Sequence, residues 1–458
     1  MTVLARTRNL TIALATAAML ASANLAGAQA PGRAANLPLI RDAEIEALLR
    51  DYTGPIFKAA GLKGGAVDVY IVNDPRFNAF VTGRRMFINT GALAISEVPN
   101  EIIGVLAHET GHIVGGHQAR MRDRVEKANI LAALSMLAGA GVAVAGGEAG
   151  AAAGPAIAYG GQSAILRGLL SYKRSEEAAA DSSAVDLLTR TGQSARGMVT
   201  TFDRFQQDLL FNRGRIDPYL QSHPMPRERI ALISRLAEQS PSYNTADPPE
   251  LLLRHQMARA KIVAYSGNGG DLQSMFRSDP QGPAARYGLA IALFLRGSDS
   301  KALPMIDRLI SEQPSNAYLH EMRGEMLLRS GQAKNAVAAF RRAIALDRHK
   351  SGILRTALGL ALLETREQGS AEQAIMELKA GLARDPTNSR GYGYLARAYG
   401  ATGKEHLARA AASEGAFYAG NVKEAKRLAK MSQPKLNTGT PEWLRMQDII
   451  DYKPPKKN

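Results

Sequence analysis

The spacing of apolar and polar positions divides the first ninety residues into a helix followed by short strands. Apolar side chains recur at helical spacing over residues 41–62, and Gly54-Pro55 is expected to kink or break this helix. Residues 66–72 alternate between apolar and polar side chains, and residues 77–82 and 85–89 have the composition of two further strands. The pattern therefore predicts a small sheet behind an amphipathic helix.

A second helix with an apolar face is expected to begin after Pro99. Asn100 is expected to cap it, and the carboxylate of Glu101 lies favourably near its positive end. The strand at residues 85–89 precedes this helix closely. We expect it either to be an ordinary buried strand or to present a free edge against which an extended substrate pairs through its main chain.

Between residues 129 and 161 the composition shifts abruptly to alanine and glycine. Small side chains let helices approach closely, so three interpretations stay open: a hairpin of packed helices, a flap over a neighbouring site, or a surface that dips into a bilayer. Gly139, Gly141, Gly146 and Gly147 weaken any long helix. A full membrane span is therefore not expected.

The second half of the chain is repetitive. After a polar, proline-containing boundary at residues 238–250, a pattern with a period of 34 residues begins at Pro283 and continues to about residue 430. It resembles tetratricopeptide repeats, in which small residues at positions 8 and 20 let the two helices of a unit touch and stacked units form a concave surface. Matching positions are Ala290, Gly297, Ala302, Leu309 and Pro314 in the first unit and Gly324, Gly331, Ala336, Phe340 and Ala343 in the second.

The amino terminus predicts export from the cytoplasm. Arg6 and Arg8 precede an apolar run that ends in the small-residue site Ala26-Gly27-Ala28, so residues 1–28 are expected to form a cleaved signal peptide rather than an uncleaved anchor. The expected domains are a signal peptide at 1–28, a catalytic domain at 29–250, a linker with first helices at 251–282, repeats at 283–430 and a tail at 431–458.

Composition narrows the chemistry and the partners. The chain has no cysteine, which excludes disulfides and thiolate metal sites, so any metal must be held by nitrogen and oxygen ligands. Lys and Arg outnumber Asp and Glu by 57 to 42. Because no nucleic-acid-binding module is present, this positive charge favours peripheral contact with an anionic membrane over nucleic acid as a partner.

The predicted second helix carries His108-Glu109-Thr110-Gly111-His112. Two histidines four residues apart lie on one helical face, so both imidazoles can reach a single tetrahedral zinc ion. Glu109 is placed to accept a proton from a metal-bound water, which yields the hydroxide that attacks a peptide carbonyl. The motif predicts one zinc ion per chain with Glu109 as general base.

The third ligand is not determined by this motif. In the metzincin pattern a histidine would stand at the position of Gln118, and His117 lies one residue too early, so we expect His117 to be structural. A helical segment further on offers one carboxylate to complete the site and another to accept the spare N–H of a ligating imidazole. Spacing alone does not separate Glu176 from Glu177, and Asp181 shares a helical face with Glu177.

Together these motifs resemble the HtpX and CAAX prenyl endopeptidase family, and the signal peptide and repeats make the chain similar to its BepA-like periplasmic branch. The resemblance implies an α+β zincin-like metalloprotease domain, mostly helical with a small sheet, followed by an all-α tetratricopeptide-repeat solenoid. It also implies that Glu177 is the third zinc ligand and that Asp181 supports a ligating histidine. The residues that carry it are Asn78-Ala79-Phe80, Thr90-Gly91, His108 to His112, Arg174 to Asp181, His223-Pro224 and Arg229-Ile230.

Two further residues acquire roles through this resemblance. His223 is expected to approach the zinc, either as a fourth ligand that holds the enzyme latent or as a donor to the tetrahedral oxyanion; the other interpretation is a capping imidazole in a turn. Arg229 either pairs with a carboxylate of the catalytic domain or stabilises the same oxyanion. We list Glu109, His223 and Arg229 as the candidate catalytic residues.

Two functions are compatible with these patterns. The first is a periplasmic zinc endopeptidase that degrades misfolded or stalled envelope and outer-membrane proteins, with the repeats recruiting unfolded clients or outer-membrane assembly machinery. The alternative is a chaperone or adaptor module whose metal site is largely latent. Replacement of Glu109 by glutamine separates them, because only the first function requires proteolysis.

Overall fold

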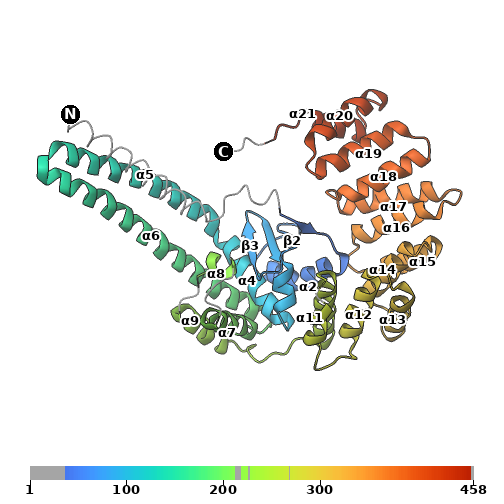
Figure 1. Cartoon of the computed structure of the whole chain (residues 1–458), viewed down its shortest axis with the longest axis horizontal. Coiled ribbons are helices and arrows are strands. Elements are labelled where there is room, and N and C mark those ends of the chain that lie inside the picture. Colours follow the sequence, from blue (N-terminus) through green and yellow to red (C-terminus); the bar gives the residue numbers. More distant parts are fainter. Residues whose placement is uncertain (1–36, 212–217, 225–226, 268, 455–458) are drawn as a thin grey trace. The chain divides into compact units, whose positions relative to one another are not determined.

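The computed structural model describes residues 37–211, 218–224, 227–267 and 269–454 (Figure 1), so the predicted signal peptide lies outside the described residues. The chain divides into two compact units. The first contains residues 37–40 and 50–248 among those described, and the second contains residues 41–49 together with everything from residue 249 onward. A short segment near the amino terminus therefore belongs to the same unit as the repeats.

Helix α2 (Ala43–Ala59) is continuous, and the break expected at Gly54-Pro55 is absent. Both residues are exposed. Water can therefore satisfy the carbonyl group that proline leaves without an N–H donor, which lowers the cost of proline inside the helix.

One four-stranded sheet lies in the first unit, with the order β1-β2-β4-β3. The strands are β1 (Leu39–Ile40), β2 (Asp68–Val72), β3 (Ala79–Thr82) and β4 (Arg85–Asn89). β2 pairs with β4 in parallel, and β3 pairs with β4 antiparallel. Because β4 has a neighbour on each side, it is the ordinary buried strand, and the expectation of a free edge at residues 85–89 is wrong.

The helix with the histidine motif is α4 (Pro99–Gly115), which follows the short helix α3 (Thr90–Ile95). Its cap is Val98, two residues before the expected Asn100, because proline is preorganised for the first position of a helix. Asn100 is therefore not the cap. Its side chain accepts the N–H of Gly197 at 3.0 Å and so joins α4 to α7 (Arg196–Phe211).

The alanine- and glycine-rich segment forms a long hairpin of two helices, α5 (His117–Ala145) and α6 (Gly147–Arg190) (Figure 1). α5 continues through Gly139 and Gly141 despite their low helix propensity, whereas Gly146 and Gly147 lie where α5 ends and α6 begins. Close packing explains the continuity of the helix at Gly139, because a Cβ atom there would lie 2.5 Å from the carbonyl oxygen of Gly154 on α6. By length and composition, α5 alone among the described helices is apolar enough to cross a membrane.

The second unit is helical among its described residues. α10 (Pro249–Tyr265) and α11 (Gly269–Met275) occupy the predicted linker, and helix pairs follow at the predicted period. Gly297, Gly331 and Gly403 adopt φ of 78°, 75° and 71° in the turns between paired helices, a conformation that glycine tolerates best. The pairs are α12 (Pro283–Leu295) with α13 (Asp299–Glu312), α14 (Ala317–Arg329) with α15 (Ala333–Leu346), α16 (Gly352–Thr365) with α17 (Ser370–Arg384), and α18 (Ser389–Ala401) with α19 (Glu405–Tyr418).

Small residues at position 8 of the repeats act as expected. A Cβ atom at Gly324 would lie 2.8 Å from the ring of Phe340, and one at Gly359, one residue past position 8 in the third unit, would lie 2.5 Å from Leu378. The two helices of each unit therefore touch where the side chain is missing. Beyond the pairs, the chain adds α20 (Val422–Ser432), the 3-10 helix η2 (Gln433–Lys435) and α21 (Pro441–Asp451).

Candidate metal centre

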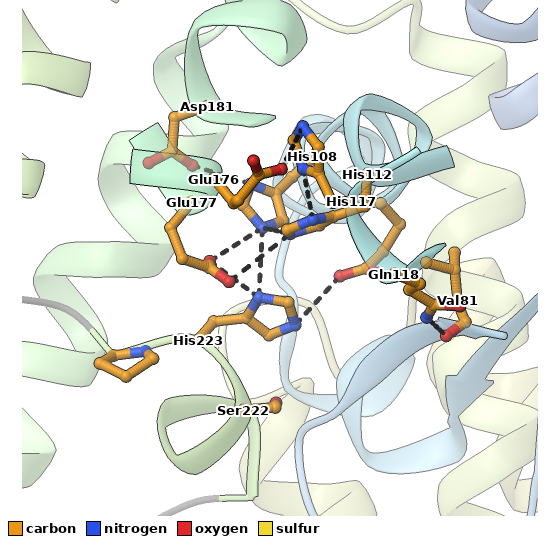
Figure 2. A network of polar contacts seen from close by, with 12 residues as sticks. Val81, His108, His112, His117, Gln118, Glu176, Glu177, Asp181, Ser222 and His223 are labelled. Carbon is orange, nitrogen blue, oxygen red and sulfur yellow. Dashed lines mark hydrogen bonds and ion pairs between the residues drawn. The ribbon is translucent and has the colours of Figure 1, made fainter. Parts of the chain in front are cut away.

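Helical elements of the first unit bring the candidate residues together, and Figure 2 shows His108, His112, Glu177, Asp181 and His223 gathered in one place. α4 supplies the histidine motif and α6 supplies two acidic residues, while α8 (Pro218–Ser222) and α9 (Arg227–Glu238) position the remaining pair. Every one of these side chains is buried. They are His108, Glu109, His112, Glu177, Asp181, His223 and Arg229, with exposed fractions of 0–8%.

Glycine at the centre of the motif permits this convergence. A Cβ atom at Gly111 would lie 2.8 Å from the carbonyl oxygen of Ala180 and 3.1 Å from its Cα atom. Because both contacts involve backbone, a larger residue could not be accommodated by a side-chain rotation. Gly111 therefore lets α4 approach the part of α6 that carries Glu177 and Asp181.

Four potential ligand atoms face one another, one each from His108, His112, Glu177 and His223, and all lie within 4.8 Å. The Nε2 atoms of His108 and His112 are 3.0 Å apart, and His108 Nε2 is 3.3 Å from His223 Nδ1. Glu177 Oε2 lies 2.9 Å from His223 Nδ1 and 3.5 Å from His108 Nε2, while Glu177 Oε1 lies 3.7 Å from His112 Nε2.

These separations fit a tetrahedral metal ion. Bonds of about 2.0–2.1 Å to a tetrahedral zinc place neighbouring ligand atoms about 3.3 Å apart. Three imidazole nitrogens and a carboxylate also form the donor set that such a metal accepts. The lone pairs of neutral imidazoles repel one another at these distances unless a proton or a cation lies between them, so the arrangement favours a bound cation.

Asp181 and Arg229 contact the potential ligand residues His108 and Glu177. Asp181 Oδ1 lies 2.8 Å from His108 Nδ1, which directs the Nε2 atom of that ring toward the other ligands. Arg229 donates from Nε and Nη2 to the two oxygens of Asp181 at 2.5 and 2.9 Å. Its Nη1 atom lies 3.0 Å from Glu177 Oε2. Arg229 thus takes the first of its two expected roles, pairing with carboxylates.

The ionisation of the centre shows that it attracts positive charge. Burial lowers the pKa of His108, but the Asp181 carboxylate outweighs this effect and raises that pKa to about 9. Burial and the neighbouring His108 lower the pKa of His112. Burial opposes ionisation of Glu177, yet His223 and His108 hold the pKa of its carboxyl well below the usual value. The cluster therefore combines an ionised carboxylate with a neutral imidazole suited to coordination.

Glu109 differs from the surrounding carboxylates. It is 1% exposed, and neither of its carboxylate oxygens has a hydrogen-bond partner among the described residues. His223 lies beside it, with its Nε2 atom 3.4 Å from Glu109 Oε1. Burial raises the pKa of Glu109. A buried carboxylate that is held beside the ligands without a hydrogen bond is available to exchange a proton with a bound molecule.

The structure also separates Glu176 from Glu177. Glu176 Oε2 lies 3.0 Å from His117 Nε2 and 2.7 Å from Arg120, on the side of the site away from the ligand atoms. His117 Nδ1 is 2.9 Å from His112 Nδ1, so it contacts the back of that imidazole. His117 therefore supports His112 and is not part of the ligand group, as expected from its position in the sequence.

Tyr219 is a component of the centre that sequence analysis missed. Its ring lies 4.7 Å from that of His223 at a tilt of 32°, and it also packs against Phe77 and Phe205. Burial, followed by the nearby Glu109, raises the pKa of Tyr219 well above its usual value. Its spacing of four residues before His223 is the signal that could have identified it, because such residues share a helical face.

This fold and donor set define a metal-dependent hydrolase centre of the kind found in zinc peptidases. Residues 39–237 match Peptidase family M48. The match contains every residue of the candidate centre, so this part of the chain is a metalloprotease domain similar to that family, and a helical repeat unit follows it.

The relatives resemble this chain over most of its length. The beta-barrel assembly-enhancing protease of Escherichia coli K12 is 23% identical, over 83% of this chain and 77% of that protein. Its counterpart in Yersinia pestis is 22% identical, over 91% of this chain and 85% of that protein. A similar protein from Vibrio cholerae is 26% identical, but the match spans only 58% of that protein. A solved structure of MamA from Desulfovibrio magneticus covers 38% of this chain with a TM-score of 0.30 and 18% identity.

Proposed function

We propose that this chain is a periplasmic zinc endopeptidase that hydrolyses peptide bonds in misfolded or stalled outer-membrane and other envelope proteins. The observation that carries the proposal is the convergence of His108, His112 and Glu177 on one point beside Glu109, whose carboxylate accepts no hydrogen bond from the described residues. The names of the relatives, which describe proteases that enhance beta-barrel assembly, support the choice of substrate. The predicted signal peptide supports the location.

Each residue of the site has a distinct role in the proposed reaction. His108, His112 and Glu177 would hold one zinc ion, and Asp181 orients the ring of His108. A zinc ion bound there would supply Lewis acidity and lower the pKa of a water molecule in its open position. Glu109 then accepts the proton of the attacking water, because burial makes its carboxylate a stronger base.

His223 is proposed to keep the site latent. Its Nδ1 atom lies 3.3 Å from His108 Nε2 and 2.9 Å from Glu177 Oε2, so it occupies the position that water or substrate needs. Its Nε2 atom is close to Glu109, which would otherwise act as base. Displacement of His223 by a bound substrate would open the site, whereas Arg229 stays with its carboxylate partners.

The repeat unit is proposed to recruit unfolded clients or the outer-membrane assembly machinery. Stacked helix pairs form the extended surfaces on which such repeats bind proteins. The alternative function, a chaperone or adaptor with a latent metal site, draws support from the same contact of His223 with the ligand atoms. Both functions use the same repeats, and they differ in whether client release requires cleavage.

The test combines zinc analysis with casein cleavage by the purified chain and two variants. Glu109→Gln is expected to retain zinc and to lose cleavage by about 10²–10⁴-fold, because only the proton acceptor is removed. Glu177→Ala is expected to lose both zinc and activity. Glu176→Gln is the matched control, since that carboxylate faces His117, and it should keep the metal.

Three results would change the proposal. Full zinc and activity in Glu177→Ala would show that the third ligand lies elsewhere. Full activity in Glu109→Gln would remove its role as base. A client phenotype that survives Glu109→Gln would favour the chaperone or adaptor function over proteolysis.

A further inference from the structure

The α5–α6 hairpin exposes an unusually apolar surface. Ten of the twenty exposed large hydrophobic side chains among the described residues lie between residues 130 and 170. The most apolar stretch of α5 has a mean hydropathy of 1.9, and only 11% of it is buried. The ten residues are Ile130, Leu131, Leu134, Leu137, Val142, Val144, Ile157, Tyr159, Leu166 and Leu170.

Small residues already occupy the interface between the two helices. A Cβ atom at Gly154 would lie 2.4 Å from the carbonyl oxygen of Gly139, and one at Gly161 would lie 2.6 Å from the hydroxyl of Ser135. At 100° per residue, the side chains of Leu134 and Leu137 point away from this contact. The hairpin therefore packs through its small residues and turns its large apolar side chains outward.

The outward faces of both helices are apolar. Leu166 and Tyr159 on α6 are 46% and 61% exposed, and Leu137 on α5 is 68% exposed. A protein partner that docks on one side would leave the opposite face in water at a cost of about 25 cal/mol per Å² of apolar surface. An apolar medium that surrounds the hairpin covers both faces, which favours lipid over a second copy of the chain.

The arms of the hairpin are nearly uncharged and its base is positively charged, a distribution that suits a membrane. Between Lys127 and Arg167 the one charged residue is Glu148, at the tip. At the base, residues 120–127 and 167–174 contain seven basic and two acidic side chains. Positive charge beside an apolar segment binds the anionic headgroups of a bilayer, and each basic residue near the surface contributes about 1 kcal/mol.

The length of the uncharged arms matches a bilayer. Residues 128–146 and 149–166 form arms of about 28 and 27 Å at 1.5 Å per residue, and the hydrocarbon core of a bilayer is about 30 Å thick. Inserted tip first, the arms would lie in hydrocarbon and the basic base would lie among the headgroups. Glu148 would then reach the opposite interface, where its charge can be hydrated.

We propose that the α5–α6 hairpin inserts into a lipid bilayer that contains anionic headgroups. Insertion rests on the hairpin alone. One consequence rests on the proposed function: Glu177 lies four residues beyond Lys173, or about 6 Å along the same helix, so the metal centre would face substrates at the membrane surface.

Flotation with vesicles tests the insertion. The purified chain is expected to float with vesicles of phosphatidylcholine and phosphatidylglycerol, and more weakly with phosphatidylcholine alone. The double substitution Leu134→Glu and Leu137→Glu should weaken flotation at least tenfold, because a charged residue in hydrocarbon is strongly disfavoured. Leu444→Glu is the matched control, since this leucine is 51% exposed on α21.

A second measurement uses the absence of cysteine from the chain. Leu137→Cys labelled with an environment-sensitive fluorophore should become brighter and blue-shifted on addition of the vesicles, whereas labelled Leu444→Cys should not change. Equal flotation of the double variant and the original chain, or an unchanged Leu137→Cys label, would overturn the proposal. The proposal would also be overturned if the original chain forms a dimer in solution, the double substitution abolishes this dimer, and neither protein binds the vesicles.

Casein cleavage keeps the two proposals separate. The double variant should cleave soluble casein at the rate of the original chain, because the hairpin residues lie outside the metal centre. Loss of flotation with cleavage unchanged supports insertion independently of the proposed function. If the chain floats with vesicles but has no peptidase activity, the proposed function is wrong and the proposed membrane insertion is supported.

Discussion

Each unit of this protein buries a cluster of charged residues, and the two clusters differ in what lies at the centre. In the first unit, imidazole nitrogens and the Glu177 carboxylate face one another within 4.8 Å. In the second, the ammonium group of Lys261 lies 2.7 Å from Asp42 and 3.2 Å from Glu44. Tyr287 donates to the same Glu44 carboxylate at 2.8 Å.

The comparison explains why similar burial leads to different roles. Lys261 is 3% exposed, and although burial lowers its pKa, Asp42 and the other acidic neighbours raise that pKa well above its usual value. The second cluster is therefore compensated by a cation that belongs to the chain. In the first cluster the internal cation, Arg229, pairs with Asp181 and with Glu177 Oε2, but no cation of the chain lies between the imidazole nitrogens that face one another, and a metal ion could occupy that point.

Removal of the internal cation should have the largest effect. Lys261→Met leaves the buried Glu44 and the partly exposed Asp42 without their partner, and we expect it to destabilise the second unit by about 3–5 kcal/mol. Urea unfolding monitored through Trp443, the single tryptophan, measures this unit. Lys334→Met is the control, because its ion pair with Glu367 is exposed and should contribute little. Equal stability of the two variants would contradict the central role of Lys261.

Addition of the external cation should stabilise only the first unit. Zinc at about 100 times its dissociation constant is expected to stabilise the unit that binds it by about 2.7 kcal/mol. Hydrogen exchange of α4 amides should slow accordingly, and α10, which carries Lys261, should not respond. Glu177→Gln should abolish the effect. Zinc-dependent protection of α10 instead of α4 would show that the metal binds in the second unit and that our assignment is wrong.

Removal of the Asp181 carboxylate, which contacts the ring of His108, should have an intermediate effect. Asp181→Asn removes the negative charge that orients the imidazole, and we expect it to weaken zinc affinity about 10–100-fold, measured by competition with a chelating dye. Asp186→Asn on the same helix is the control, since its side chain is 62% exposed. The same loss in both variants would mean that the change acts through α6 as a whole.

The smallest effect should come from Glu321, a buried acidic residue whose desolvation the charge of Lys261 offsets only in part. Burial raises the pKa of Glu321 well above its usual value, and Glu321 Oε2 has no hydrogen-bond partner among the described residues. A raised pKa in the folded state favours folding below the unfolded pKa, and this contribution is lost as the pH rises through the folded pKa. Glu321→Gln should therefore be more stable than the original chain by about 1 kcal/mol at pH 8.

This difference should vanish near pH 4, where the carboxyl of Glu321 is protonated in both states. Urea unfolding of the variant and the original chain at several pH values measures it through Trp443. Parallel pH profiles for the two proteins would show that Glu321 does not titrate with folding.

Local patterns in the sequence were sufficient where neighbours along the chain decide the structure. The helical spacing of His108 and His112 put both rings on one face, and the turns at Gly297 and Gly331 follow the predicted repeat. Local rules were insufficient where another segment changes the energy of a helix. Gly139 did not end α5, because α6 packs against it closely enough to offset its low helix propensity.

The sequence by itself determined the histidine helix, the short strands, the repeat period and a small set of candidate carboxylates, because each depends on periodicity within one segment. The tertiary structure alone decided that Glu177 faces the histidines while Glu176 faces His117, and that Tyr219 packs on His223. It also placed residues 41–49 in the repeat unit, beside Lys261. Spacing along a helix determines which residues share a face, but the packing of distant segments determines what that face meets.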